Sequence, residues 1–140
     1  MTPAAPGQPL AILVFRIMTT RLGIDARQIA RTTRLPAPPA TAGTGLHYFH
    51  ERVPFAMAVE TYQAPAILYP ATGLGVTGGL IVDQLEQLQT LDSRSIRRLP
   101  RWLNPPHRPH PCWGIAMQDD GLILLMDLAK VLCPGPSLSQ

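Results

Sequence analysis

The chain has 140 residues, of which 46% are hydrophobic and 15% charged, and a formal net charge of +3. This length and composition predict one globular domain rather than a disordered segment. So small a net charge does not indicate a nucleic-acid partner. The longest apolar run, residues 10–15, is far shorter than the roughly 20 residues that a membrane-spanning helix needs, so we expect no membrane insertion. Because that run also lacks the flanks of a signal peptide, we expect a cytoplasmic chain with reduced cysteines.

Sixteen prolines and eleven glycines divide the chain into short segments, which favours strands joined by turns over long helices. Residues 1–9 are predicted to be a flexible leader and residues 134–140 a flexible tail. Runs of β-favouring residues between them predict strands. The predicted strands are 10–18, 21–25, 46–49, 52–59, 66–69, 79–83, 113–118 and 122–127, with an extended stretch over 26–35.

The connections between these strands carry turn signals. Residues 36–45 form an uncharged Pro/Ala/Gly/Thr segment, and residues 104–111 hold four prolines, so both are predicted loops. The strands 46–49 and 52–59 are predicted to form a hairpin-like pair around His50 and Glu51. An Asp-Asp-Gly turn at 119–121 predicts the clearest hairpin of the chain, and residues 128–132 one closing turn of helix. Many short strands with such turns predict an all-β barrel or sandwich.

Four motifs occur in order between residues 10 and 132. They are ILVFRI followed by RLGIDARQIARTTRLP, then VPFAMAV, then GLIVDQLEQLQTL followed by IRRLP, and finally GIAMQDDGLILLMDLAKVL. Together they resemble the CheW-like domain family of chemotaxis coupling proteins. The resemblance implies an all-β fold over 10–133, made of two small SH3-like β-barrel subdomains packed together, with a short C-terminal helical turn.

The same resemblance implies a function by binding, without catalysis, cofactor or metal. A CheW-like adaptor couples chemoreceptors, or a pilus or phototaxis sensory system, to the regulatory domain of a CheA-type histidine kinase. The resemblance places Ile29 and Arg31 in the receptor-binding groove; the alternative for Ile29 is an ordinary core residue. The kinase-binding corner is carried over to four consecutive residues, for which ordinary surface is the alternative. These are Phe49, His50, Glu51 and Arg52.

Two departures from the family pattern fall at these binding positions. The Arg-Gly pair that the family shows before its proline is replaced here within residues 49–51, and Arg31 stands where the family has an acidic residue. Since like charges across an interface cost affinity, Arg31 leads to the hypothesis of a receptor with a compensating acid.

Two interpretations stay open for residues 81–91. Ile81, Leu85 and Leu88 follow the i, i+4, i+7 spacing of an amphipathic helix. The family resemblance instead predicts a strand that bulges after Asp83. We favour the strand through Val82.

Other motifs indicate different functions. Residues 73–78 match G-x-G-x-x-G, which would bind a nucleotide only if a helix followed; a small nucleotide-binding protein or enzyme is therefore the alternative function. His107, His110 and Cys112 have a spacing that could suggest zinc, but two prolines interrupt it and we expect no metal site. An acid-free stretch over 93–113 carries five arginines, for which a solvated face or an acidic protein partner is favoured over nucleic acid. These are Arg94, Arg97, Arg98, Arg101 and Arg108.

Overall fold

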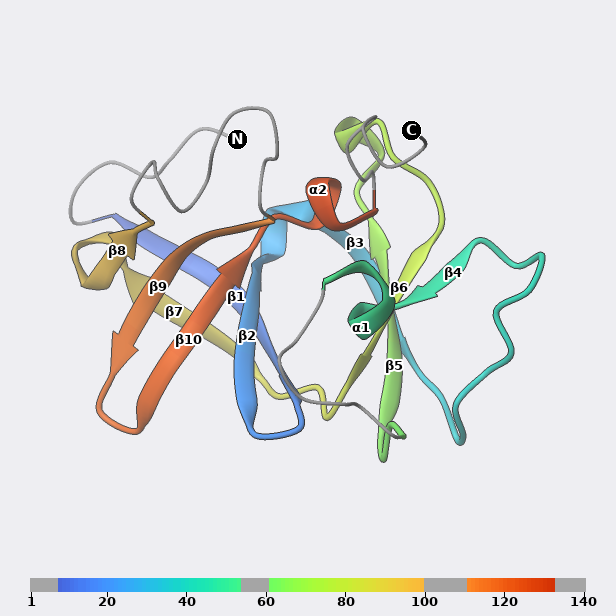
Figure 1. The fold of residues 1–140 in the computed structure, drawn as a ribbon. Helices are drawn as coiled ribbons and strands as arrows, with labels where there is room; N and C mark the ends of the chain where they lie inside the picture. Colours follow the sequence, from blue (N-terminus) through green and yellow to red (C-terminus); the bar gives the residue numbers. More distant parts are fainter. Residues whose placement is uncertain (1–7, 54–60, 100–110, 133–140) are drawn as a thin grey trace.

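The computed structural model describes residues 8–53, 61–99 and 111–132. Two curled β-sheets make up most of this part of the chain and stand side by side (Figure 1). They confirm the prediction of an all-β chain with two small barrel-like subdomains packed together. Of the predicted leader and tail, residues 1–7 and 134–140 lie outside the described residues, while the first strand already begins at Pro9.

The larger sheet, sheet A, has six strands in the order β7-β1-β2-β10-β9-β8. Its strands are β1 (Pro9–Ile17), β2 (Thr20–Asp25), β7 (Leu88–Asp92), β8 (Ile96–Arg98), β9 (Cys112–Gln118) and β10 (Gly121–Met126). Neighbouring strands are antiparallel, except that β2 and β10 run parallel. This parallel contact joins the early part of the chain to its late part in one sheet.

Sheet B has four strands in the order β3-β5-β6-β4. They are β3 (Ile29–Arg34), β4 (Leu46–Tyr48), β5 (Pro65–Pro70) and β6 (Gly79–Asp83). All four come from the stretch of chain between β2 and β7, so sheet B is an insertion into sheet A. The chain enters sheet B through a 3-10 turn, η1 (Ala26–Gln28), and returns through residues 84–87.

Strand β1 is buried on both faces. Ile12 and Val14 pack inside the curl of sheet A, whereas Phe15 and Ile17 belong to a second cluster that sheet B shares. Because successive side chains of a strand point to opposite faces, a strand between two cores needs the near-continuous apolar run seen here. The shared cluster includes Leu68, Leu80, Ile81 and Val82 of sheet B and Leu128, Val131 and Leu132 of the closing helix α2 (Leu128–Leu132).

Two segments differ from the predictions. Residues 49–52 form a helical turn, α1 (Phe49–Arg52), in place of the predicted tight turn at His50 and Glu51. Phe49 is fully buried against Phe15, with ring centroids 5.4 Å apart. Burying this ring draws the chain inward after β4. Residues 54–60 of the second predicted strand lie outside the described residues. Residues 26–28, predicted to be extended, form η1 because the carboxylate of Asp25 accepts a hydrogen bond from Arg27 N at 2.9 Å.

The helix alternative for residues 81–91 is wrong. Strand β6 ends at Asp83, Gln84 has a left-handed backbone (φ 47°), and β7 then pairs with β1. This confirms the predicted strand and the irregularity after Asp83. The i, i+4, i+7 spacing arose from two separate strands and the link between them.

The return crossing at residues 84–87 is held by charges as well as by the backbone. Glu86 N donates to the carbonyl of Val14 at 2.7 Å. The Glu86 carboxylate lies 3.3 Å from Arg16 Nη2 and 3.2 Å from Arg21 Nη2. The Arg21 side chain is only 10% exposed, and its Nη1 lies 3.2 Å from Asp120 Oδ1. These four side chains close the end of sheet A where its turns meet the crossing.

Candidate functional site

Gln28 lies where the chain passes from sheet A to sheet B, and it is almost completely buried (4% exposed). Its Nε2 donates to Asp127 Oδ1 at 3.1 Å, and its Oε1 accepts from the backbone N of Leu128 at 2.9 Å. Its carbonyl accepts from Ala71 N at 2.8 Å. Asp127 and Leu128 join β10 to α2, and Ala71 precedes the 3-10 turn η2 (Thr72–Leu74). Through its amide nitrogen, its amide oxygen and its carbonyl, this one residue ties three segments together.

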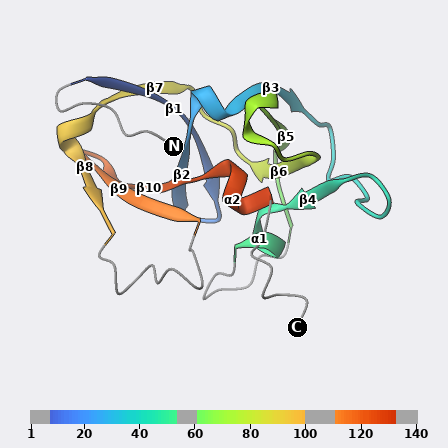
Figure 2. The ribbon, with the colours of Figure 1, turned by 90° about the horizontal axis from the view of Figure 1, so that it is seen from above.

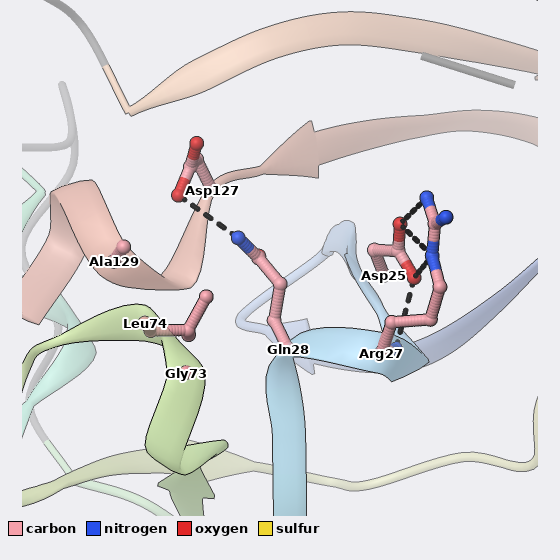
Figure 3. Close-up of a pocket in the computed structure, with 7 residues that line it drawn as sticks. All are labelled: Asp25, Arg27, Gln28, Gly73, Leu74, Asp127 and Ala129. Atoms are coloured by element: carbon pink, nitrogen blue, oxygen red, sulfur yellow. Dashed lines mark hydrogen bonds and ion pairs between the residues drawn. The ribbon is translucent and has the colours of Figure 1, made fainter. Parts of the chain in front are cut away.

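A pocket of about 440 Å³ opens beside this tie (Figure 3). Three segments line it: the turn η1 with the residue before it, the turn η2, and the start of α2. Its volume lies at the small end of the range for ligand pockets, which suits a protruding side chain better than a large cofactor. The lining residues are Asp25, Arg27, Gln28, Gly73, Leu74, Asp127 and Ala129.

Asp25 and Arg27 form the charged side of the pocket. Asp25 is 2% exposed, and its Oδ2 accepts from Arg27 Nη2 at 2.7 Å and from Nε at 3.1 Å. The hydrogen bond with Asp25 raises the pKa of Arg27, whose side chain stays 64% exposed. On the opposite side, Asp127 Oδ1 also accepts from Lys130 N at 3.3 Å. The pocket thus presents a fixed cation on one side and a carboxylate on the other.

The structure places Ile29 directly after Gln28, at the start of β3, where it is half-buried against the shared core. It adjoins the pocket without being among its lining residues. Arg31 lies further along β3, opposite Tyr69, and is exposed. Its guanidinium lies 3.8 Å from the centroid of the Tyr69 ring, a cation–π distance. The two predicted receptor-binding residues are therefore on one strand, but only Ile29 is next to the pocket.

The predicted kinase-binding residues 49–52 form α1. Phe49 belongs to the core and can support a partner surface only by packing. His50 and Arg52 are half-buried and Glu51 is exposed. Glu51 Oε1 accepts from Tyr48 N at 3.0 Å, which closes the first turn in the manner of a capping box. The kinase-binding role of these residues stays a prediction.

Three rings pack beside α1. Tyr48, His50 and Tyr62 lie with centroids 5.0 to 5.6 Å apart. The Tyr62 hydroxyl accepts from His50 N at 3.2 Å and lies 3.0 Å from His50 Nδ1. Burial raises the pKa of Tyr62, so the hydroxyl keeps its proton near neutral pH. His47 contacts Arg52 at 3.0 Å, and burial followed by the charge of Arg52 lowers the pKa of His47.

Helix α2 stands between the turn η1 and α1 (Figure 2). Its first turn lines the pocket, and its apolar residues Leu128, Val131 and Leu132 enter the shared core. The two predicted binding regions thus lie on opposite sides of one short element that is anchored in the core.

Comparison with known proteins identifies the fold. No family model matches the chain, and no curated protein matches its sequence. Among solved structures, it is similar to the scaffolding protein TtCheW of Thermoanaerobacter tengcongensis, with a TM-score of 0.63 and 20% identity. The similarity covers 89% of this chain and 92% of that one. The chain has a CheW-like fold.

In this CheW-like fold the glycine-rich segment 73–78 is a turn between two strands. Gly75 ends η2 with φ 71°, Gly78 has φ 91°, and β6 begins at Gly79. A nucleotide fingerprint needs a helix N-terminus at this point to hold the phosphates, and a strand occupies it instead.

Several predictions concern residues outside the described part of the CheW-like fold. His107 and His110 of the zinc alternative, and Arg101 and Arg108 of the basic stretch, are among them. Cys112 is described and buried, and burial raises the pKa of its thiol. Among residues 8–53, 61–99 and 111–132, no cluster of three His, Cys, Asp or Glu side chains could hold a metal ion. No helix in these ranges is long and apolar enough to cross a bilayer.

Sequence reasoning missed the pocket and its tie. Gln28 and Asp127 are 99 positions apart along the chain, and nothing in either local sequence indicates that they meet. Arg27, which pairs with Asp25 two positions earlier, is a further lining residue that sequence reasoning did not name. The signal available was the position of Asp25, the last residue of β2, and of Asp127, which directly follows β10.

Proposed function

We propose that this chain is a non-catalytic signalling adaptor of the CheW type that works in the cytoplasm. In this proposal it couples a methyl-accepting chemoreceptor, or an analogous pilus or phototaxis sensor, to the regulatory domain of a CheA-type histidine kinase. The observation that supports it is the extent of the similarity to a scaffolding protein, which covers 89% of this chain and 92% of the other. The likeness therefore concerns the whole described scaffold and not one shared motif.

The arrangement of the two candidate surfaces also supports an adaptor. The turn η1, which lines the pocket and precedes Ile29, lies on one side of α2, and α1 with His50 and Arg52 lies on the other (Figure 2). Both are attached to the same buried cluster, so two partners can bind a scaffold that stays rigid. Binding sites for helical partners combine an apolar anchor with rim charges, and Ile29 beside Arg31 and Arg27 offers that combination.

Size-exclusion chromatography with the purified regulatory domain of a cognate kinase tests the kinase half of the proposal. We expect co-elution, and we expect it to weaken in the variant His50→Ala/Arg52→Ala. The control Arg97→Ala changes an exposed residue of β8 in sheet A and should co-elute like the wild type. Absence of co-elution, together with a melting temperature that rises with added nucleotide, would overturn the adaptor in favour of the nucleotide-binding alternative.

The variant Arg31→Glu tests the receptor half. If Arg31 faces an acidic residue of the receptor, reversing its charge should weaken binding to the receptor tip by up to about 25-fold, because it removes an exposed ion pair of up to about 1 kcal/mol and adds a repulsion of similar size. Arg98→Glu changes an equally exposed arginine on β8 and should leave the Kd unchanged. Equal affinity of the Arg31→Glu variant and the wild type in a titration would refute the compensating-acid hypothesis.

A further inference from the structure

Strand β3 is an end strand of sheet B, and on its outer side no strand of the described residues pairs with it. It is the longest of the four end strands in the two sheets, with six residues against three in β4, five in β7 and three in β8. Four of those six residues are exposed (Figure 2 shows β3 along the outer side of sheet B). A long, exposed end strand is the structural element to which an extended peptide can add.

The backbone groups that point outward from β3 follow from its register with β5. Leu35 N donates to the carbonyl of Pro65 at 2.9 Å. Hydrogen-bonded pairs alternate with non-bonded pairs in an antiparallel ladder, so Thr33 with Ile67 forms the next bonded pair. The alternation leaves the N–H and C=O of Thr32 and Arg34 directed away from β5. A bulge at Ala30 interrupts the ladder only before Arg31.

The charge of this edge has one sign. Arg31 and Arg34 are exposed, and residues 29–35 contain no acid. Both guanidinium groups are held in place, Arg31 over the Tyr69 ring and Arg34 by a hydrogen bond to the carbonyl of Leu85 at 3.3 Å. Binding of a partner to these two side chains therefore costs less conformational entropy than binding to a mobile arginine.

The spacing of Arg31 and Arg34 along β3 also determines which positions of an added strand lie opposite them. They are three positions apart on a strand that is regular from Arg31 onward, so their side chains lie on opposite faces of the sheet. In a strand added to this edge, the residues directly opposite them are also three positions apart. Two acids at i and i+3 would each meet an arginine, whereas two acids at i and i+2 would share one face and meet only one.

We propose that the outer edge of β3 binds an extended acidic segment of a partner protein by strand addition, with acidic residues at i and i+3. The outward N–H and C=O groups of Thr32 and Arg34 supply the backbone pairing, and Arg31 and Arg34 select the charge pattern. This proposal goes beyond the binding function proposed above, because it names an extended segment where that function expects a helical partner. Its test uses neither kinase nor receptor, so the two proposals fail separately.

Charged edge strands and bulges also protect sheets against unwanted pairing. The alternative hypothesis is therefore that Arg31 and Arg34 only prevent other strands from pairing with β3. Two capped peptides of equal composition distinguish the cases: TEVTEVT, with its acids three apart, and TEVETVT, with its acids two apart. We expect the first to bind about two- to fivefold more tightly in an NMR titration, the difference of one exposed ion pair. Equal affinities would overturn the proposed register, and absence of binding at millimolar peptide would leave the arginines with a protective role alone.

Amide hydrogen exchange locates the bound peptide. Strand addition should slow exchange at Thr32 and Arg34, whose N–H groups point outward, and should leave Thr33 unchanged because its N–H already pairs with β5. Slowed exchange elsewhere with no change at Thr32 and Arg34 would overturn the proposal.

Matched variants separate this edge from general charge attraction. Arg31→Gln/Arg34→Gln should raise the Kd for TEVTEVT about 4- to 25-fold, the product of two exposed ion pairs. Arg97→Gln/Arg98→Gln removes the same charge from the end strand β8 of sheet A and should not change the Kd. Circular dichroism checks that both double variants are folded. An equal rise in Kd for the two would show non-specific charge attraction and refute the proposal.

Discussion

At the residue scale, Gly78 explains why a glycine-rich segment lies between η2 and β6. Its φ of 91° is in the left-handed region, and a Cβ at this position would overlap the carbonyl oxygen of Gly45. That same carbonyl accepts a hydrogen bond from Gly79 N at 3.1 Å, so it cannot move away without losing the bond. Glycine is needed at this position because two backbone segments lie in close contact, and not because a phosphate binds.

Gly78→Ala should therefore lower the free energy of unfolding by about 3 kcal/mol, which is typical of enforced backbone strain with a steric conflict. Gly73→Ala is the matched control, because its Cβ would meet nothing within 4 Å and its φ is not positive. It should change stability by about 0.5 kcal/mol or less. Urea unfolding of both variants checks this, and similar midpoints for the two would contradict it.

Gln28 is the second residue whose replacement should lower the stability of the fold. Gln28→Ala leaves the N–H of Leu128 and one bond of Asp127 without their partner inside a buried junction. An unsatisfied buried group costs about 1–3 kcal/mol, and we expect a loss of that size in urea unfolding. Gln63→Ala is the control, since Gln63 is exposed and bonds to Asp83 through its backbone. A loss for Gln28→Ala no larger than for Gln63→Ala would show that the tie contributes nothing.

At the scale of the elements, three aspartates at the ends of strands bond to backbone N–H groups: Asp25 and Asp83 are the last residues of β2 and β6, and Asp127 directly follows β10. Asp25 accepts from Arg27 N, and Asp127 from Lys130 N. Asp83, which is 4% exposed, accepts from Ala64 N at 2.6 Å and from Gln84 N at 3.0 Å. Each carboxylate pairs N–H groups of a turn, helix or loop that packs against the end of a strand. These hydrogen bonds are the structural role of the aspartates in the motifs RLGID, GLIVD and LILLMD, which carried the resemblance to CheW-like domains.

Strands with clear alternation or a continuous apolar run could be predicted from the sequence, and so could their turns. The helical turn α1 could not, because its cause is the burial of Phe49 against Phe15, more than thirty positions away. For the same reason the spacing of Ile81, Leu85 and Leu88 left two interpretations open. What decides between helix and strand there is the pairing of β7 with β1.

At the scale of the whole molecule, the two sheets are joined by the shared core and by two chain crossings. Gln28 ties the first crossing, and Glu86 holds the second through Arg16 and Arg21. The Glu86 side chain is 28% exposed and that of Arg21 only 10%, so water screens this pair less than an ordinary surface pair.

Glu86→Gln should lower the free energy of unfolding by about 1–2 kcal/mol, between the values for exposed and for buried ion pairs. Arg94→Gln is the control, because the Arg94–Asp92 pair is exposed on both sides (74% and 41%) and should contribute less than about 1 kcal/mol. Thermal unfolding at low and high salt checks the prediction. A loss for Glu86→Gln equal to that for Arg94→Gln would mean that the crossing is held by the backbone and the core alone.

The sequence by itself determined the class of fold, because strand periodicity, turn residues and strand-terminal aspartates act over a few positions. It also carried the resemblance to CheW-like domains, confirmed at the level of the fold by a structure only 20% identical. The tertiary structure alone decided which face of β1 meets which core, where Gln28 and Asp127 meet, and which strand is left at the edge of sheet B. Those features depend on contacts between residues tens of positions apart. Such contacts form only when the whole chain has packed, so no local pattern encodes them.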